Sequence, residues 1–149
     1  MLPGRGARRP LMDAFDADVI IYAAVAGQPL GRRVAGLLQR SRQRYAGVGS
    51  VVLIPEVLSK PLRDGGTAEV LMLAGLLARL DLRPVDRATA ELATALAAKY
   101  GLKPADAVHL ALAVAVGAGR FITNNQHDFP RTIAEVRVTH PAEMADETS

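Results

Sequence analysis

The chain has 149 residues, enough for one domain with its own hydrophobic core, and half of these residues are hydrophobic although only 4% are aromatic. It has no cysteine, which excludes disulfides and thiolate metal sites, and its longest apolar runs are too short to cross a bilayer. The formal net charge of +3 is compatible with an anionic partner such as nucleic acid, and equally with an ordinary basic protein. We therefore expect a cytoplasmic protein with no membrane segment.

The chain begins with a basic segment, residues 1–10, which we expect to form a flexible arm, so that Met12 is an alternative to Met1 as the true start. Residues 11–15 predict a short strand. Asp18 can cap a helix over residues 19–25, because its side chain can accept from free backbone N–H groups. Hydrophobic periodicity alone also allows the strand to lie at the start of that helix.

A basic amphipathic helix is predicted over residues 31–45, ended by glycines. The apolar run 51–54 is typical of a strand that is buried on both faces of a parallel sheet. Pro55 fits the first position of the next helix, which Pro61 should interrupt. A leucine-rich helix follows over residues 67–80, with a threonine as its cap.

The second half of the chain continues the alternation of strands and helices. The predicted elements are a strand over residues 82–85, a helix from Asp86 to Tyr100 closed by Gly101, a helix over residues 104–116, a strand over residues 120–123 and an edge strand over residues 136–138. Strands that alternate with helices predict a parallel sheet with helices on its faces, an α/β fold. We expect the acidic tail, residues 141–149, to fray.

Three acids, Asp16, Glu56 and Asp106, each lie beside a short apolar segment. Ligands of open parallel sheets bind outside the carboxyl ends of the strands, where Asp16 and Glu56 are expected. Asp106 opens a helix and joins them only if that helix begins at the same edge. A lone acid in a first helical turn is usually a cap, which is how we interpret Asp18 and Asp86. Clustered carboxylates, by contrast, bind hard cations such as Mg²⁺.

Four short motifs in this order resemble those of PIN domains over about residues 11–140. They are Phe15-Asp-Ala-Asp-Val-Ile-Ile-Tyr22, Ile54-Pro-Glu-Val-Leu58, Asp106-Ala-Val-His-Leu-Ala111 and Phe121-Ile-Thr-Asn-Asn-Gln-His-Asp-Phe129. The length is similar to that of the compact VapC-like toxins. The resemblance implies a three-layer α/β/α PIN-like fold with a short central parallel sheet.

The resemblance also implies a function, a Mg²⁺- or Mn²⁺-dependent endoribonuclease in which Asp16, Glu56 and Asp106 hold the metal. The fourth acid of the family motif is replaced here by Asn125. Asp128 lies three residues later and is an alternative, so both are candidate catalytic residues. The metal would activate a water molecule for attack on the RNA phosphodiester.

Residues around this set are candidates for supporting roles. Thr123 and Asn124 could orient water or phosphate, and the alternative is simple capping of the loop. His109 lies one turn after Asp106 and could touch substrate or support a metal ligand, although we favour a packed helix histidine. Arg33, Arg40 and Arg44 are candidates for contacts with an RNA backbone, the alternative being a solvated helix face.

A VapC-like toxin implies a small antitoxin as partner, and a homodimer is also expected. The leucine-rich helix over residues 67–80 could serve either contact, although core packing is the simpler interpretation. Two other functions stay open: a non-catalytic PIN-like scaffold that binds RNA or protein, and an α/β domain that binds a phosphorylated metabolite. The sequence has neither a Gly-x-Gly-x-x-Gly nor a Gly-Lys-Ser/Thr phosphate loop, which disfavours the last.

Overall fold

The computed structural model describes residues 11–25 and 27–144, which contain five strands, six α-helices and one 3-10 helix. The predicted basic arm lies outside the described residues. In chain order the elements are β1 (Asp13–Phe15), α1 (Ala17–Ala23), α2 (Pro29–Arg40), β2 (Gly47–Ser50), α3 (Leu53–Arg63), α4 (Thr67–Leu77), β3 (Leu80–Arg83), α5 (Arg87–Tyr100), α6 (Pro104–Ala115), β4 (Arg120–Ile122), β5 (Arg137–Thr139) and η1 (Pro141–Glu143).

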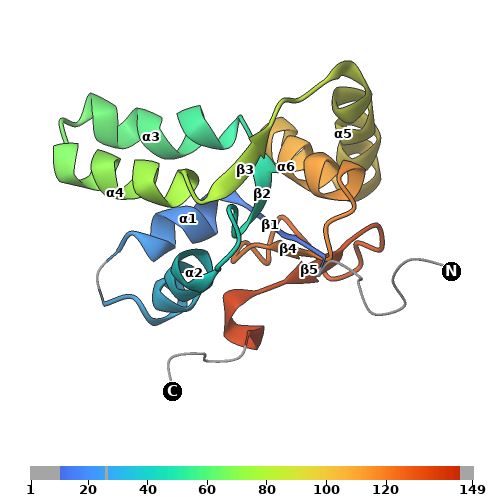
Figure 1. Cartoon of the computed structure of the whole chain (residues 1–149). Coiled ribbons are helices and arrows are strands. Elements are labelled where there is room, and N and C mark those ends of the chain that lie inside the picture. The colour runs from blue at the N-terminus through green and yellow to red at the C-terminus, as the bar shows by residue number, and fades with distance from the viewer. Residues whose placement is uncertain (1–10, 26, 145–149) are drawn as a thin grey trace, which may run out of the picture.

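The five strands form one parallel sheet in the order β3-β2-β1-β4-β5. In Figure 1, helices lie on both sides of this sheet, and the pair α3 and α4 extends away from the pair α5 and α6. The predicted three-layer α/β/α architecture is therefore confirmed. The strand order reverses at β1, which pairs with β2 on one side and with β4 on the other. In open α/β sheets this switch point is where ligands bind.

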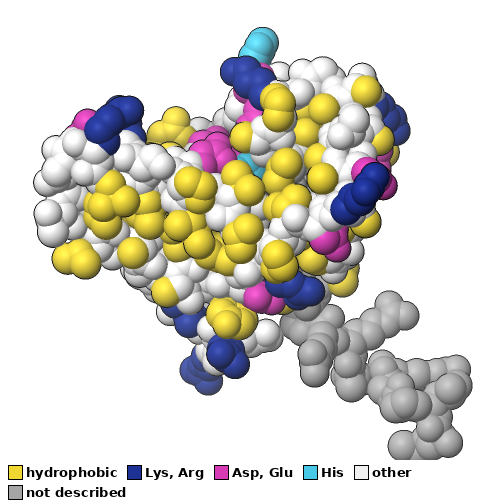
Figure 2. Space-filling model, turned by 90° about the horizontal axis from the view of Figure 1, so that it is seen from above, with side chains coloured by type: hydrophobic (Ala, Val, Ile, Leu, Met, Phe, Trp, Pro, Cys, Tyr) yellow, Lys and Arg dark blue, Asp and Glu magenta, His cyan; other side chains and the backbone are white. Residues whose placement is uncertain are grey.

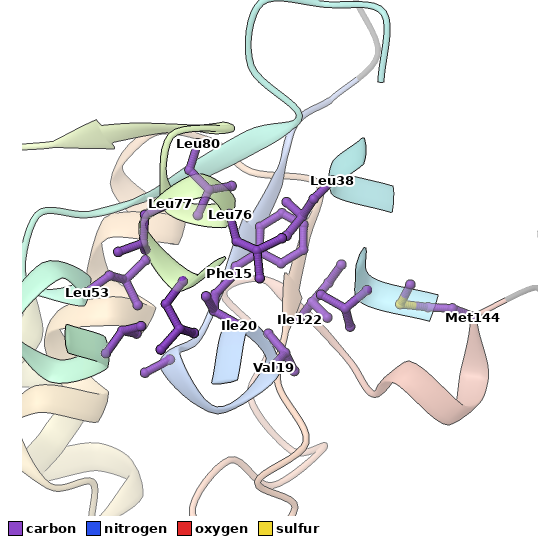
Figure 3. Packing of buried hydrophobic residues seen from close by; sticks show 14 residues of the cluster. Phe15, Val19, Ile20, Leu38, Leu53, Leu76, Leu77, Leu80, Ile122 and Met144 are labelled. Carbon is purple, nitrogen blue, oxygen red and sulfur yellow. The ribbon is translucent and has the colours of Figure 1, made fainter. Parts of the chain in front are cut away.

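Each face of the sheet has its own core because side chains alternate along a strand. Phe15 and Ile122 point into a core shared with α1 to α4, part of which Figure 3 shows. Ala14 and Phe121 point to the other face, where they pack against α5 and α6. The two cores fix β1 and β4 side by side, and with them the residues that follow these strands.

The second strand differs from its predicted position: it covers Gly47–Ser50, and the apolar run 51–54 instead leads into α3. A Cβ atom at Gly47 would lie 2.5 Å from the Asp13 carbonyl oxygen and 2.5 Å from the Phe15 ring. Glycine is thus required here by the close approach of β1 and β2, although a glycine in the sequence usually indicates a turn.

Other boundaries also differ from the predictions. Asp16, not Asp18, caps α1, because the helix begins two residues earlier than predicted. Helix α2 ends at Arg40 instead of residue 45. Pro61 lies inside α3 without ending it, and the residue before α4 is Gly66, with no side-chain cap from Thr67.

The predicted helix α5 is confirmed at both ends. The Asp86 side chain accepts from the Thr89 backbone N–H at 2.8 Å, and Gly101 closes the helix at φ +68°. The beginning of the predicted frayed tail is folded: Pro141–Glu143 form η1, and Met144 is buried in the core. Among the described residues, no helix is both long and apolar enough to cross a membrane.

Candidate functional site

Asp16 lies at the centre of the carboxyl edge, directly after β1 and with only 3% of its surface exposed. Its Oδ1 accepts from the Ala17 backbone N–H at 2.8 Å, and its Oδ2 accepts from the Thr123 hydroxyl at 2.8 Å. Because Thr123 follows β4, this second bond joins the two strands of the switch point. Burial raises the pKa of Asp16 to about 6, and the nearby Asp18 carboxylate adds to the shift.

Asp18 belongs to the same cluster, although the sequence suggested only a cap. Its Oδ2 accepts from the Asn124 backbone N–H at 3.0 Å, whereas its Oδ1 is buried with no hydrogen-bond partner among the described residues. Burial also raises the pKa of Asp18. One signal in the sequence could have indicated this: Asp18 lies two residues after Asp16, in the first helical turn, and so faces the same edge.

Glu56 comes from the first turn of α3 and contacts His109 of α6 through Oε2 and Nε2. The His109 side chain is fully buried, whereas that of Glu56 is 33% exposed. His109 is therefore the packed helix histidine that we favoured, and it also holds a candidate metal ligand. Its Nδ1 is buried and has no partner within the described part of the chain.

Asp106 lies in the first turn of α6. Burial raises its pKa to about 6, and the charges of Asp16, Asp128 and Glu56 add to the shift. Helix α6 therefore begins at the carboxyl edge, as the site requires. Figure 2 shows acidic side chains beside a histidine in the hollow between the α3–α4 side and the α5–α6 side of the molecule.

The loop after β4 holds both candidates for the fourth acid. The Asn125 side chain donates to the Asp128 carboxylate and accepts from the Asp128 backbone N–H. The Asn125 backbone N–H donates to the Thr123 hydroxyl oxygen at 3.1 Å. Asn124 approaches the site through its backbone, which binds Asp18, so none of the described contacts gives its side chain a role.

These residues suit a hard divalent cation in their chemistry, since their side chains present carboxylate oxygens and one buried oxygen, Asp18 Oδ1, is unpartnered. Within the described ranges, however, no three His, Asp or Glu side chains are arranged closely enough to form a complete cation site. Mg²⁺ keeps several of its waters and needs only one or two protein carboxylates, so a looser set is sufficient.

Contacts within the chain engage the candidate arginines Arg33 and Arg44. Arg33 donates to the carbonyl oxygens of Pro141, Ala142 and Met144 at 3.1–3.2 Å, so its guanidinium is engaged by the C-terminal segment. Arg40 ends α2, and Arg44 lies over the Tyr45 ring in the connection to β2. That connection reaches the amino end of β2, opposite the carboxyl edge where the acids lie.

Comparisons with known proteins agree with the fold. A family model described as PIN domain matches residues 14–134. A solved toxin–antitoxin complex from Klebsiella pneumoniae contains a chain with a TM-score of 0.68 and 23% sequence identity, over 87% of this chain and 98% of that one. No curated protein matches the sequence.

Proposed function

Because the chain belongs to the PIN domain family, we propose that it is a Mg²⁺- or Mn²⁺-dependent endoribonuclease of the VapC-like toxin type. PIN domains are generally nucleases. The observation on which the proposal rests is the buried carboxylate of Asp16, which Thr123 fixes at the switch point of the sheet and which interacts with the charges of Asp18 and Asp106. Such a set of like charges is costly to bury unless a cation compensates it.

Asp16, Glu56 and Asp106 are the residues that would hold the cation. When bound, a divalent ion acts as a Lewis acid that polarises a phosphodiester and lowers the pKa of water. The chain itself supplies the orientation of the three carboxylates. Thr123 fixes Asp16 by a hydrogen bond, and His109 fixes Glu56. Asp106 has no such partner among the described contacts, so it is free to adjust to the ion.

The loop after β4 would complete the site on the side of Asp106. Asp128 lies near enough to raise the pKa of Asp106, and Asn125 holds it in place. We therefore assign the role of the fourth acid to Asp128, with Asn125 as its support. Thr123 acts in this scheme on Asp16, not directly on the substrate.

The proposed substrate is RNA, and the proposed partner is a small antitoxin, with a homodimer as the resting assembly. The toxin–antitoxin complex of similar fold supports the partner. Apolar side chains exposed on α3 and α4, namely Leu62, Leu71 and Met72, supply surface for such contacts. The buried Leu73, Leu76 and Leu77 of α4 serve the core, as the simpler interpretation of this helix predicted. We expect the protein to act in the cytoplasm, where its RNA substrate is made.

Cleavage of mixed RNAs by the purified protein in Mg²⁺ or Mn²⁺, with and without EDTA, tests the proposal. Two N-cap aspartates provide a matched pair of variants, since the side chains of both Asp16 and Asp86 accept from backbone N–H groups. We expect Asp16→Asn to abolish cleavage and Asp86→Asn to leave it unchanged. Equal cleavage by all proteins, with or without EDTA, or none by the wild-type chain, would contradict the proposal.

A further inference from the structure

We propose that His140 is a positioning residue of the site, which acts on Asp16 through Thr123. The inference rests on the proposed function, since it concerns the orientation of the same metal-binding carboxylate. His140 lies outside the four motifs of the family resemblance, and it is 1% exposed.

The contact between His140 and Thr123 follows from the register of the last two strands. Ile122 is paired with Thr139, and the Thr123 backbone N–H donates to the Thr139 carbonyl oxygen at 3.1 Å. His140, the next residue, places its Nδ1 2.8 Å from the Thr123 carbonyl oxygen. A carbonyl oxygen can only accept, so Nδ1 must hold the proton in this contact.

Hydrogen bonds thus engage both the carbonyl oxygen and the hydroxyl group of Thr123. His140 binds its carbonyl oxygen, while its hydroxyl donates to Asp16 Oδ2 and accepts from the Asn125 backbone N–H. Strand β4 ends at Ile122, and the bond from the Thr123 backbone N–H to β5 is the last one of the sheet on this side. The imidazole adds a bond to the carbonyl oxygen of Thr123 and so helps to direct its hydroxyl toward Asp16.

His140 is itself anchored independently of the site. Arg33 of α2 donates to the carbonyl oxygens of Pro141, Ala142 and Met144, and Met144 is buried in the core beside α2. Because the backbone that follows His140 is fixed in this way, His140 can impose its geometry on Thr123 instead of following it. Outer-sphere partners of metal ligands commonly change metal affinity or activity about 10–100-fold.

The test compares three variants with the wild-type protein. His140→Leu keeps the bulk but removes the donor, His140→Asn keeps an N–H group near the position of Nδ1, and Ile133→Ala destabilises the core on the other face of the sheet, beside α5 and α6. We expect His140→Leu to lower Mn²⁺ affinity and kcat about tenfold with KM for RNA unchanged. His140→Asn should recover most of both, and Ile133→Ala should change neither in the folded protein.

A readout that needs no catalysis is the ¹⁵N–¹H spectrum of the metal-free protein. The backbone N–H groups of Ala17 and Asn125 report directly on Asp16 and on the Thr123 hydroxyl. Both resonances should move in His140→Leu and stay in place in Ile133→Ala. The wild-type imidazole should show a protonated Nδ1, a measurement that stands even if His140→Leu does not fold.

The inference is overturned by an unprotonated Nδ1, by unchanged Ala17 and Asn125 resonances in folded His140→Leu, or by equal losses in His140→Leu and His140→Asn. If the wild-type chain cleaves no RNA, the proposed function fails, whereas the spectra still decide whether His140 orients Thr123 and Asp16.

Discussion

The side-chain amide of Asn125 forms hydrogen bonds to Asp128 through both its nitrogen and its oxygen. The Asn125 amide nitrogen donates to Asp128 Oδ2 at 2.7 Å, and the Asn125 Oδ1 accepts from the Asp128 backbone N–H at 3.1 Å. An aspartate at position 125 could not donate to Asp128, and the two carboxylates would repel each other. The structure therefore predicts that an acid is favourable at position 128 and unfavourable at position 125.

We predict that Asn125→Asp, which restores the acid of the family motif, lowers Mn²⁺ affinity about tenfold instead of raising it. Asp128→Asn should have a similar effect. The double swap, Asn125→Asp with Asp128→Asn, restores a donor and an acceptor between the two positions and is the control for loop structure. Titration calorimetry with Mn²⁺ measures all three. Tighter binding or faster cleavage by Asn125→Asp would assign the role to position 125.

The raised pKa of Asp106 predicts that the stability of the metal-free protein depends on pH. Its pKa is raised from 3.8 to about 6, so the folded state binds the proton more tightly than the unfolded state does. This group therefore favours folding below pH 3.8 relative to higher pH, and its contribution falls as the pH rises to about 6.

The variant Asp106→Asn removes this pH-dependent contribution to the free energy of unfolding. Because Asp106 is partly exposed, we expect a gain of only about 1 kcal/mol in the free energy of unfolding at pH 7.5 in EDTA, and little gain near pH 4. Urea unfolding of both proteins at the two pH values gives the difference. Added Mg²⁺ should stabilise the wild-type protein more than the variant. A variant less stable than wild type at pH 7.5 in EDTA would refute the predicted repulsion.

Gly31 and Gly75 form a matched pair for the packing of the helical layer. A Cβ atom at Gly31 would lie 2.0 Å from the Tyr22 carbonyl oxygen, where α2 crosses the end of α1, whereas one at Gly75 of α4 would meet nothing within 4 Å. We predict that Gly31→Ala destabilises the protein by about 1–3 kcal/mol. Gly75→Ala should instead stabilise it by about 0.5–1 kcal/mol through helix propensity. Thermal unfolding of the two variants should show shifts of opposite sign.

Substitution of Asp86, the N-cap of α5, should change the stability of the protein without changing the candidate metal site. Its side chain accepts from the Thr89 backbone N–H, and this bond lowers its pKa. Asp86→Ala should lower the melting temperature of the protein, the usual direction of losing an N-cap. Mn²⁺ affinity should remain that of the wild-type protein. A loss of metal binding at constant fold would mean that α5 influences the site in a way that the described contacts do not predict.

Local signals in the sequence predicted those elements that local chemistry decides. Helix α5 has a capping aspartate at one end and a left-handed glycine at the other, and both were predicted. The strand β2 was misplaced because its glycines are required by tertiary contacts, Gly47 with β1 and Gly49 with Leu53 and Leu82, which leave no local pattern.

The same distinction applies to the site. Asp16 and Glu56 were expected at one edge of the sheet because both follow strands, and Asp106 only if its helix begins at that edge. In the fold the charges of Asp16 and Glu56 raise the pKa of Asp106. Asp18 and His140 were missed. The first resembles an ordinary cap, and the second acts through a pairing of β4 with β5 that only the register reveals.

Strand β1 is the first strand to be translated, whereas β4, one of its two neighbours in the sheet, is translated more than 100 residues later. The hydrogen bond from Thr123 to Asp16 spans 107 positions. A ribosome has therefore synthesised most of the domain before this bond can form, and the contact from His140 comes later still. A nascent chain that has not yet exposed β4 lacks the bond that fixes Asp16, so the proposed nuclease site would not be assembled at that stage of translation.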